Sequence, residues 1–422
     1  MYAKILLIAY QCGPGMGSVS QIGWEWFIRL SQTNQVTLVT HIRNRFAIEK
    51  MGALSGNNEI IYIDTEWFAG PLYRLAKRIF PRSEHSVFLV SSLDYFVFDA
   101  AAFFQIKKLN KNGNKWDIIH RVTPVTTAAP TWLGRLGLPL VLGPLNSGLS
   151  DPKGFDKIMS QESSWLIRFR EFGKIFDALI GSSKRAACIL VASKATLESV
   201  PIHYREKCVV MIENGVELAR FKATPWPNPP TLINPLQVLF VGRLIPLKAL
   251  DLLIEAVSSL SAAGVLVELT VVGDGPMRSD WEGKVKELNL INQIRFVGNL
   301  SLEGVSEYMQ RCHVFCLPSI RESGGAVLLE AMASARPVIA INFGGPGELV
   351  DTEVGELIEP TSPEQVTKDL ANSLSKIISN PEDWSLRGKV GRLRVESFYS
   401  WEAKVSSAIT LYGEILQKRS QK

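Results

Sequence analysis

The chain has 422 residues, of which 46% are hydrophobic and 21% are charged, and it carries a formal net charge of +5. This length exceeds what a single hydrophobic core serves and predicts two domains of about 200 residues each, while the composition excludes extended disorder. The mildly basic balance permits an anionic ligand or an anionic membrane surface and gives little support to nucleic-acid binding.

Short apolar runs alternate along the whole chain with longer helical patterns, which predicts parallel sheets with helices on both faces. In the first half, strands are expected at residues 5–10, 36–41, 59–63, 116–122, 138–142, 188–192 and 209–213. In the second half they are expected at residues 237–242, 268–273, 294–298, 314–318, 337–341 and 355–358. The fold class is therefore α/β, with two doubly wound parallel sheets.

A proline-rich segment, residues 224–235, separates the two halves. Its prolines exclude a helix or a central strand and predict an exposed connector. The expected organisation is a first domain over residues 1–215, a linker over 216–235 and a second domain over 236–399.

No export or membrane-spanning segment is expected. The apolar run at the N-terminus is not followed by a small-residue cleavage site, so it is interpreted as a buried strand. The most apolar longer stretch, residues 86–104, is interrupted by Asp94 and Asp99. The odd number of scattered cysteines indicates reduced thiols in a cytoplasmic protein, and the apolar surroundings of the Cys312–Cys316 segment favour core packing over a zinc site.

Residues 67–108 differ in kind from the rest of the first half. Aromatic and aliphatic residues are interleaved there with Arg74, Lys77, Arg78 and Arg82. This basic amphipathic pattern suits an anionic bilayer, but it equally suits a helix pair that covers the sheet and keeps its cations in water. Both interpretations stay open.

The strongest functional signal lies between Pro318 and Ala333. Two carboxylates, Glu322 and Glu330, flank the pair Gly324-Gly325 after an apolar strand and at the start of a predicted helix. Glycines let a ligand approach the backbone, and a helix start offers unpaired N–H groups that attract a diphosphate. Glu330, just over one turn into the helix, can accept hydrogen bonds from two neighbouring hydroxyls such as those of a ribose. The pattern indicates a sugar nucleotide, with Glu322 facing a second polyol.

Ligands of open α/β sheets bind beyond the carboxyl ends of the strands. Arg243 and Lys248 follow the first strand of the second half and offer two cations to a diphosphate. The glycine loops at 273–276 and 344–348 follow later strands, and each is also explained as a simple turn.

In the first half, Gly15 and Gly17 belong to a glycine loop after the first strand, where they can border a ligand cleft. The spacing of this loop does not fit a nicotinamide dinucleotide site. His120 ends a later strand and is a candidate for contact with sugar hydroxyls, although a lone histidine is often structural. Asn146 and Ser147 are weaker candidates of the same kind, on the acceptor side.

Taken in chain order, these motifs resemble those of family-4 retaining glycosyltransferases of the GT-B fold, in the glycosyltransferase group 1 class. The matching segments are Gly242-Arg243 with Lys248, Gly273-Asp274-Gly275-Pro276, Phe296-Val297-Gly298, Glu322 with Glu330, and Gly344-Gly345-Pro346-Gly347-Glu348. The resemblance is dense over residues 236–348 and looser in the first half. It implies two Rossmann-like domains that face a cleft, with the final helix, residues 400–422, returning to the first domain.

The resemblance also implies roles for individual residues. Arg243 and Lys248 would neutralise the donor diphosphate, Glu322 would hold donor-sugar hydroxyls, and His120 would touch the sugar; these four are the candidate catalytic residues. Glu330 would hold the ribose. The other implied donor-binding residues are Gly15, Gly17, Gly273, Gly275, Val297, Gly298, Asn299, Gly324, Gly325, Ala326 and Val327.

Three positions depart from the family pattern. Ala249 and Ala335 replace glycines that are common in the family, and Gly324 stands where an aromatic residue is frequent. These differences are interpreted as adjustments of the sugar-binding pocket, and they do not identify the donor sugar.

The implied activity is retaining transfer of a hexose from a nucleotide diphosphate sugar to a polysaccharide or lipid-linked acceptor, in bacterial surface polysaccharide biosynthesis. UDP-glucose is the first candidate donor, and no metal or other cofactor is expected. The expected location is the cytoplasm, with contact at the inner face of the plasma membrane left open. Two alternatives are a sugar-nucleotide epimerase of the same fold and a non-catalytic scaffold that binds a nucleotide sugar.

Overall fold

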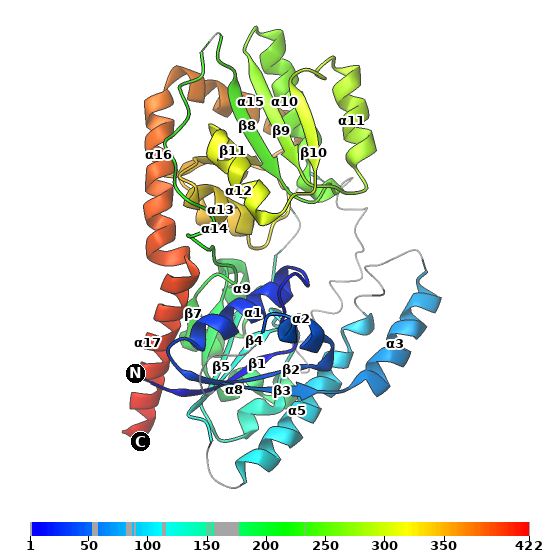
Figure 1. The fold of residues 1–422 in the computed structure, drawn as a ribbon, viewed down its shortest axis with the longest axis vertical. Coiled ribbons are helices and arrows are strands. Elements are labelled where there is room, and N and C mark those ends of the chain that lie inside the picture. Colours follow the sequence, from blue (N-terminus) through cyan, green and yellow to red (C-terminus); the bar gives the residue numbers. More distant parts are fainter. Residues whose placement is uncertain are drawn as a thin grey trace. The chain divides into compact units, whose positions relative to one another are not determined.

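The computed structural model describes residues 2–52, 58–81, 87, 90–111, 115–149, 152, 154–155, 177–231 and 233–421. They form two compact units (Figure 1). The first unit comprises Met1–Gly148, Trp165–Glu213 and Lys404–Lys422, and the second comprises Leu149–Ser164 and Asn214–Ala403. Each unit is described by itself below.

The first unit is built on a seven-stranded sheet in the order β3-β2-β1-β4-β5-β6-β7, and all its strand pairs are parallel. Its strands are β1 (Lys4–Ala9), β2 (Gln35–His41), β3 (Glu59–Ile63), β4 (Ile118–Thr123), β5 (Leu140–Leu145), β6 (Ala186–Val191) and β7 (Cys208–Val210). Its helices are α1 (Ser18–Leu30), α2 (Arg45–Glu49), α3 (Glu66–Ile79), α5 (Asp94–Asn110), α8 (Ser182–Arg185), α9 (Lys194–Ser199) and most of α17 (Trp401–Ser420).

The second unit is built on a six-stranded sheet in the order β10-β9-β8-β11-β12-β13, again with parallel pairs. Its strands are β8 (Leu236–Val241), β9 (Val267–Val272), β10 (Ile294–Gly298), β11 (Val314–Leu317), β12 (Val338–Ile341) and β13 (Gly355–Ile358). Its helices are α10 (Leu250–Ala262), α11 (Arg278–Glu287), α12 (Leu302–Arg311), α13 (Ala326–Ala333), α14 (Gly345–Leu349), α15 (Pro363–Ser379) and α16 (Pro381–Arg394).

The central strands of both sheets are buried on both faces. In β1, every residue from Ile5 to Ala9 is fully buried, and β11 and β12 are buried along their whole length. Figure 1 shows α1 and α5 on opposite faces of the first sheet. A strand covered by helices on both sides needs apolar residues at every position, which explains the continuous apolar runs in the sequence. Every strand predicted from the sequence is present, with ends shifted by a few residues.

The proline-rich segment, residues 224–235, is fixed to the second unit by some of its residues, whereas Pro225, Asn228, Pro229, Thr231 and Ile233 are exposed. The buried guanidinium of Arg336 donates hydrogen bonds to the carbonyl oxygen of Thr224 at 3.2 Å and to its hydroxyl at 2.6 Å. The indole of Trp226 donates to the carbonyl of His313 at 2.8 Å. Prolines prevent regular structure here but leave carbonyl groups free, and the second unit supplies donors for them.

The unit boundaries therefore differ from the predicted ones. The first unit ends at Glu213 instead of residue 215, and the C-terminal return begins at Lys404 instead of residue 400. The described residues between 149 and 155, which were predicted within the first domain, belong to the second unit.

Among the described residues, no helix is both long enough and apolar enough to cross a bilayer.

Candidate functional site

The second sheet has its topological switch point between β8 and β11. The chain proceeds from β8 to β9 and β10 on one side and then crosses to β11 and β12 on the other. Loops that leave neighbouring strands in opposite directions open a space at the carboxyl edge, which is where open α/β sheets bind ligands. The loops after β8 and β11 carry five of the predicted donor residues, namely Arg243, Lys248, Glu322, Gly324 and Gly325.

Lys248 and Glu322 meet at this switch point. The ammonium group of Lys248, after β8, forms an ion pair with the carboxylate of Glu322, after β11. Both side chains are mostly buried, at 17% and 19% exposed. The sequence separates them by 74 residues, so only the fold brings together a cation for a phosphate and an acceptor for sugar hydroxyls.

Arg243 lies on the same loop as Lys248, and its residue is exposed. Its guanidinium forms no hydrogen bond or ion pair with any other residue in the described part of the chain. A free forked donor beside a partly buried lysine provides two positive charges at one edge, as a diphosphate requires.

The loops after β8 and β9 are tied together through their backbones. The N–H of Leu244 donates to the carbonyl of Asp274 at 2.9 Å, and the N–H of Gly242 donates to Val272 at 3.0 Å. Gly273 has φ 128°, and a Cβ atom there would lie 2.0 Å from the carbonyl oxygen of Gly242. The glycine at 273 is thus required by close backbone packing, and the same holds for Gly275 against Leu244, where the Cβ would lie 2.3 Å from the carbonyl oxygen.

The end of the edge strand β10 joins the same edge. The N–H of Gly273 donates to the carbonyl of Gly298 at 2.8 Å, and Gly298 itself has φ 78°. Val297 is half-buried and Asn299 is exposed. The structure therefore brings the predicted donor-binding residues Val297, Gly298 and Asn299 beside the loop after β9.

Helix α13 starts without a side-chain cap. Its N-cap residue is Gly325, in the left-handed conformation with φ 61°, and no side-chain cap hydrogen bond is present among the described residues. The N–H groups of Ala326 and Val327 point out of the helix start and have no acceptor within the helix. This N-terminus lies directly after Glu322 and the buried Gly324, which suits a negatively charged ligand group.

Glu330 is half-buried on α13, and its carboxylate has no hydrogen-bond partner among the residues that the structure describes. Burial raises the pKa of this carboxyl group to about 7, and the positive charge of Arg220 partly opposes that effect. A shielded carboxylate with free acceptor sites fits the predicted contact with two ribose hydroxyls.

The loop after β12 packs on the loop that carries Glu322. The N–H of Gly345 donates to the carbonyl of Glu322 at 3.0 Å. A Cβ at Gly344, which has φ 64°, would lie 2.2 Å from that carbonyl oxygen and 3.0 Å from Cδ1 of Leu149. Leu149 was not predicted for this site, because it lies far from these loops in the sequence and no local pattern marks it.

Ser319 is a second residue that the sequence did not single out. It follows β11 and is completely buried, and its hydroxyl has no hydrogen-bond partner among the described residues. It lies three residues before Glu322 within the same loop.

Two of the three departures from the family pattern occur at unusual backbone conformations. Ala249 has φ 43° and Ala335 has φ 57°, a region that favours glycine. At both positions, alanine therefore adopts a left-handed backbone conformation that a glycine would adopt without strain.

The role predicted for His120 is wrong. Its ring is fully buried, and both nitrogens are engaged within the first unit: Nε2 lies 2.7 Å from the carbonyl oxygen of Gly143, and Nδ1 lies 2.7 Å from the hydroxyl of Tyr412. Burial lowers the pKa of the imidazole to about 4. A neutral, fully hydrogen-bonded ring has no atom free for a sugar, so His120 connects α17 to the first sheet.

The other predicted residues of the first unit lie on loops at the carboxyl edge of its sheet. Gly15 and Gly17 follow β1 and have φ values of 71° and 99°, which accounts for glycine at both positions. The amide of Asn146 donates to Glu213 at 2.5 Å, and the hydroxyl of Ser147 accepts from the N–H of Thr127 at 3.0 Å. The contacts of both side chains stabilise the loop after β5, and an acceptor role for them stays a prediction.

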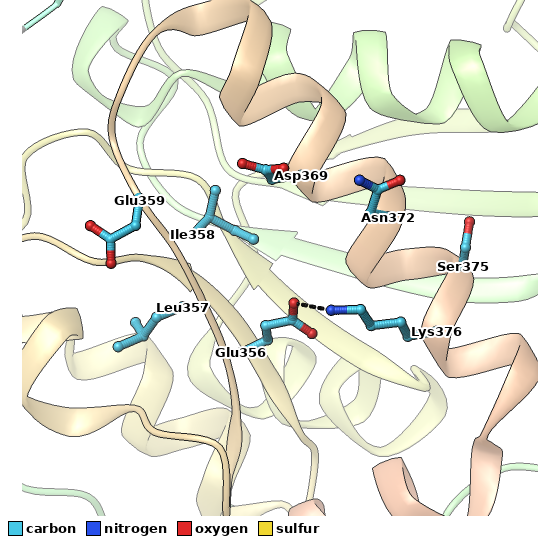
Figure 2. Close-up of a pocket in the computed structure, with 8 residues that line it drawn as sticks. All are labelled: Glu356, Leu357, Ile358, Glu359, Asp369, Asn372, Ser375 and Lys376. Carbon is cyan, nitrogen blue, oxygen red and sulfur yellow. Dashed lines mark hydrogen bonds and ion pairs between the residues drawn. The ribbon is translucent and has the colours of Figure 1, made fainter.

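A cavity of about 500 Å³ lies elsewhere in the second unit, between β13 and α15. Figure 2 shows polar side chains around it, with Lys376 directed at Glu356 at 2.6 Å. Its lining includes none of the predicted donor residues, and it lies at the edge strand β13, away from the switch point between β8 and β11. Ligand sites are usually enclosed and largely apolar, so the switch point remains the candidate site.

The two-unit architecture and the site at a switch point define the GT-B fold, and solved structures agree. Sucrose-phosphate synthase from Thermosynechococcus elongatus superposes with a TM-score of 0.64 and 22% identity, covering 99% of this chain and 100% of that one. HepE of Anabaena, solved in complex with UDP, superposes with a TM-score of 0.63 and 18% identity over 99% and 100% of the two chains. At these identities the similarity shows the fold alone.

The family described as glycosyl transferases group 1 matches residues 229–390, which include every predicted donor-binding residue of the second unit. An uncharacterized glycosyltransferase of Methanocaldococcus jannaschii is 33% identical over 178 residues, covering 42% of this chain and 48% of that protein. Together with the fold, these matches support the GT-B glycosyltransferase superfamily. The chain spans about half the length of the curated relatives it matches.

Proposed function

We propose that this protein is a glycosyltransferase that takes a hexose from a nucleotide diphosphate sugar bound at the carboxyl edge of the second sheet. The observation that carries the proposal is the pairing of Lys248 with Glu322 at the switch point, beside the uncapped start of α13. The group 1 domain over residues 229–390 supports the same assignment.

In this proposal the diphosphate displaces Glu322 as the partner of Lys248. Lys248 and Arg243 then stabilise the negative charge that develops on the leaving phosphate, and Glu322 is released to accept hydrogen bonds from the sugar. Glu330 holds the ribose. Because cationic side chains supply the positive charge, the proposed reaction requires no metal.

The proposed chemistry is transfer with retention. The bond between the anomeric carbon and the diphosphate oxygen breaks, and a bond to the acceptor oxygen forms on the same face. The acceptor proton passes to the departing phosphate, which leaves a nucleoside diphosphate and a glycoside. We propose UDP-glucose as the donor and a polysaccharide or lipid-linked acceptor of bacterial surface polysaccharide synthesis, handled at the cytoplasmic face of the membrane.

The donor is tested first by thermal shift against UDP, GDP and ADP and against their glucose, galactose and mannose forms, because a ligand that prefers the folded state raises the melting temperature. We expect one nucleotide series to stabilise the protein. If none of these nucleotides or nucleotide sugars did, the proposal would be wrong.

Lys248→Ala and Glu322→Ala are expected to lower the rate of sugar transfer at least about a hundredfold while leaving the melting temperature of the free protein nearly unchanged. Lys286→Ala, on the exposed face of α11, is the matched control and should retain activity. Comparable turnover in the two site variants and the parent would refute the assignment. NMR of the sugar product separates transfer from epimerisation, since an epimerase would turn over the donor without an acceptor.

A further inference from the structure

Helix α3 has an exposed face that the proposed reaction does not use. Figure 1 shows the helix at the outer margin of the first unit. Its buried residues are Ala69 and Ala76, seven positions apart, and it packs against α5. Two small residues bury little surface, so the larger side chains of the helix remain outside.

The exposed residues form two neighbouring rows. Residues spaced by four, three and four positions lie along one line of a helix surface. One row is apolar and contains Phe68, Leu72, Leu75 and Ile79; the first two are half-buried, whereas Leu75 and Ile79 are 53% and 57% exposed.

The adjacent row contains Trp67, Pro71, Arg74 and Arg78. Trp67 is 71% exposed, and both arginines are exposed. Neither arginine forms an ion pair or hydrogen bond within the described ranges, and the same holds for Lys77. The face therefore combines bare apolar surface with unneutralised positive charge, a pattern that suits an anionic, amphipathic partner and costs solvation free energy in water alone.

The helix is fixed in place at its first turn. Glu66 forms an ion pair with Arg43, and Arg43 also pairs with the buried Asp94, the first residue of α5. The single acidic residue of α3 is thus turned toward the body of the unit, and no negative charge of the helix lies on the exposed rows.

We propose that this face of α3 docks on an anionic lipid bilayer. The apolar row lies at the boundary between headgroups and acyl chains, Trp67 lies at the headgroup level, and the two arginines contact lipid phosphates. The proposal deepens the location given in the proposed function, but it rests on α3 alone.

The test is flotation of the full-length protein with phosphatidylglycerol–phosphatidylcholine vesicles and with pure phosphatidylcholine vesicles, without any sugar nucleotide. We expect the parent to float with the anionic vesicles only and to dissociate as salt increases. Because no donor is present, the result is independent of whether the protein transfers sugar.

Arg74→Gln with Arg78→Gln is expected to weaken binding to anionic vesicles about thirtyfold, or about fivefold for each basic side chain removed. Leu75→Ser with Ile79→Ser is expected to weaken it at least about tenfold. Matched controls in the second unit are Lys286→Gln with Lys389→Gln, which changes the net charge equally, and Ile233→Ser, whose side chain is 92% exposed.

Absence of flotation by the parent would overturn the proposal. An equal loss of vesicle binding in the control variants would also overturn it, because binding would then depend on the net charge of the protein and not on α3. Analytical ultracentrifugation adds a further check. If the parent dimerised and Leu75→Ser with Ile79→Ser dissolved the dimer, the face would bind a second copy of the chain instead of lipid. Melting curves of all variants establish that they are folded.

Discussion

At the residue scale, the candidate site combines side chains whose charges are adjusted by their surroundings. Lys248 and Glu322 satisfy one another in the free protein, whereas Glu330 lies half-buried with no hydrogen-bond donor to its carboxylate among the described residues. A site that leaves an acidic group unsatisfied loses folding free energy at that position. Such an arrangement is typical of binding sites, because a ligand can supply the missing donors.

Glu330→Gln tests this interpretation through the pH dependence of stability. Burial raises the pKa of the Glu330 carboxyl from 4.5 to about 7, so its ionisation increasingly destabilises the folded state as pH rises between these values. The variant should gain about 3 kcal/mol over the parent at pH 8 and gain nothing from this effect at pH 4. Denaturant unfolding at both pH values measures the difference. An equal change in unfolding free energy at the two pH values would show that folding does not raise the pKa of this carboxyl group.

At the element scale, the site depends on loops whose backbones approach one another at the ends of the strands. The loops after β8 and β9 are joined by backbone hydrogen bonds, and glycines remove the side chains that would separate them. The loops after β11 and β12 are joined in the same way. Precise placement of charged side chains therefore depends on residues that carry no functional group.

Gly273→Ala is expected to lower the free energy of unfolding by at least about 3 kcal/mol and to weaken nucleotide binding, since the new Cβ would collide with a carbonyl oxygen at a φ that alanine rarely adopts. Gly283→Ala is the matched control. Gly283 lies within α11 with nothing within 4 Å of the added Cβ, so this change should raise stability by about 0.5–1 kcal/mol. Denaturant unfolding of both variants measures the contrast, and similar effects at the two positions would contradict it.

At the scale of the whole molecule, the two units carry different candidate features. The first unit holds the glycine loop after β1 and the exposed face of α3. The second unit holds the predicted donor residues that lie together at the carboxyl edge of its sheet. Glu213 and Lys404 both belong to the first unit, and within it the buried ammonium group of Lys404 donates to the carbonyl of Glu213 at 2.9 Å.

Hydrogen exchange of the full-length protein with and without UDP is expected to show this division. Binding should slow exchange in residues 242–248, 273–276, 298–299, 322–330 and 344–348, because a ligand at the switch point stabilises these loops. Slower exchange over residues 11–17 would in addition support the predicted donor contact of Gly15 and Gly17. Protection confined to the β13–α15 cavity would place the nucleotide elsewhere and contradict the proposed site.

The sequence by itself determined the two sheets, the order of their strands along the chain and the loops that carry the donor residues. The reason is local: strands buried on both faces need unbroken apolar runs, and a ligand at strand ends needs glycines and charges directly after them. Arg243, Lys248, Glu322 and Glu330 could be selected in this way as candidate donor residues, and their roles stay predictions.

Only the tertiary structure decided which side chains from distant segments of the chain contact one another. It paired Lys248 with Glu322, placed Leu149 against the glycine loop at 344, and covered His120 with Tyr412, which removed it from the predicted site. It also fastened the proline-rich segment to Arg336. In each case the partner comes from a remote part of the chain, and a local pattern shows that a side chain is polar or apolar without showing what will satisfy or cover it.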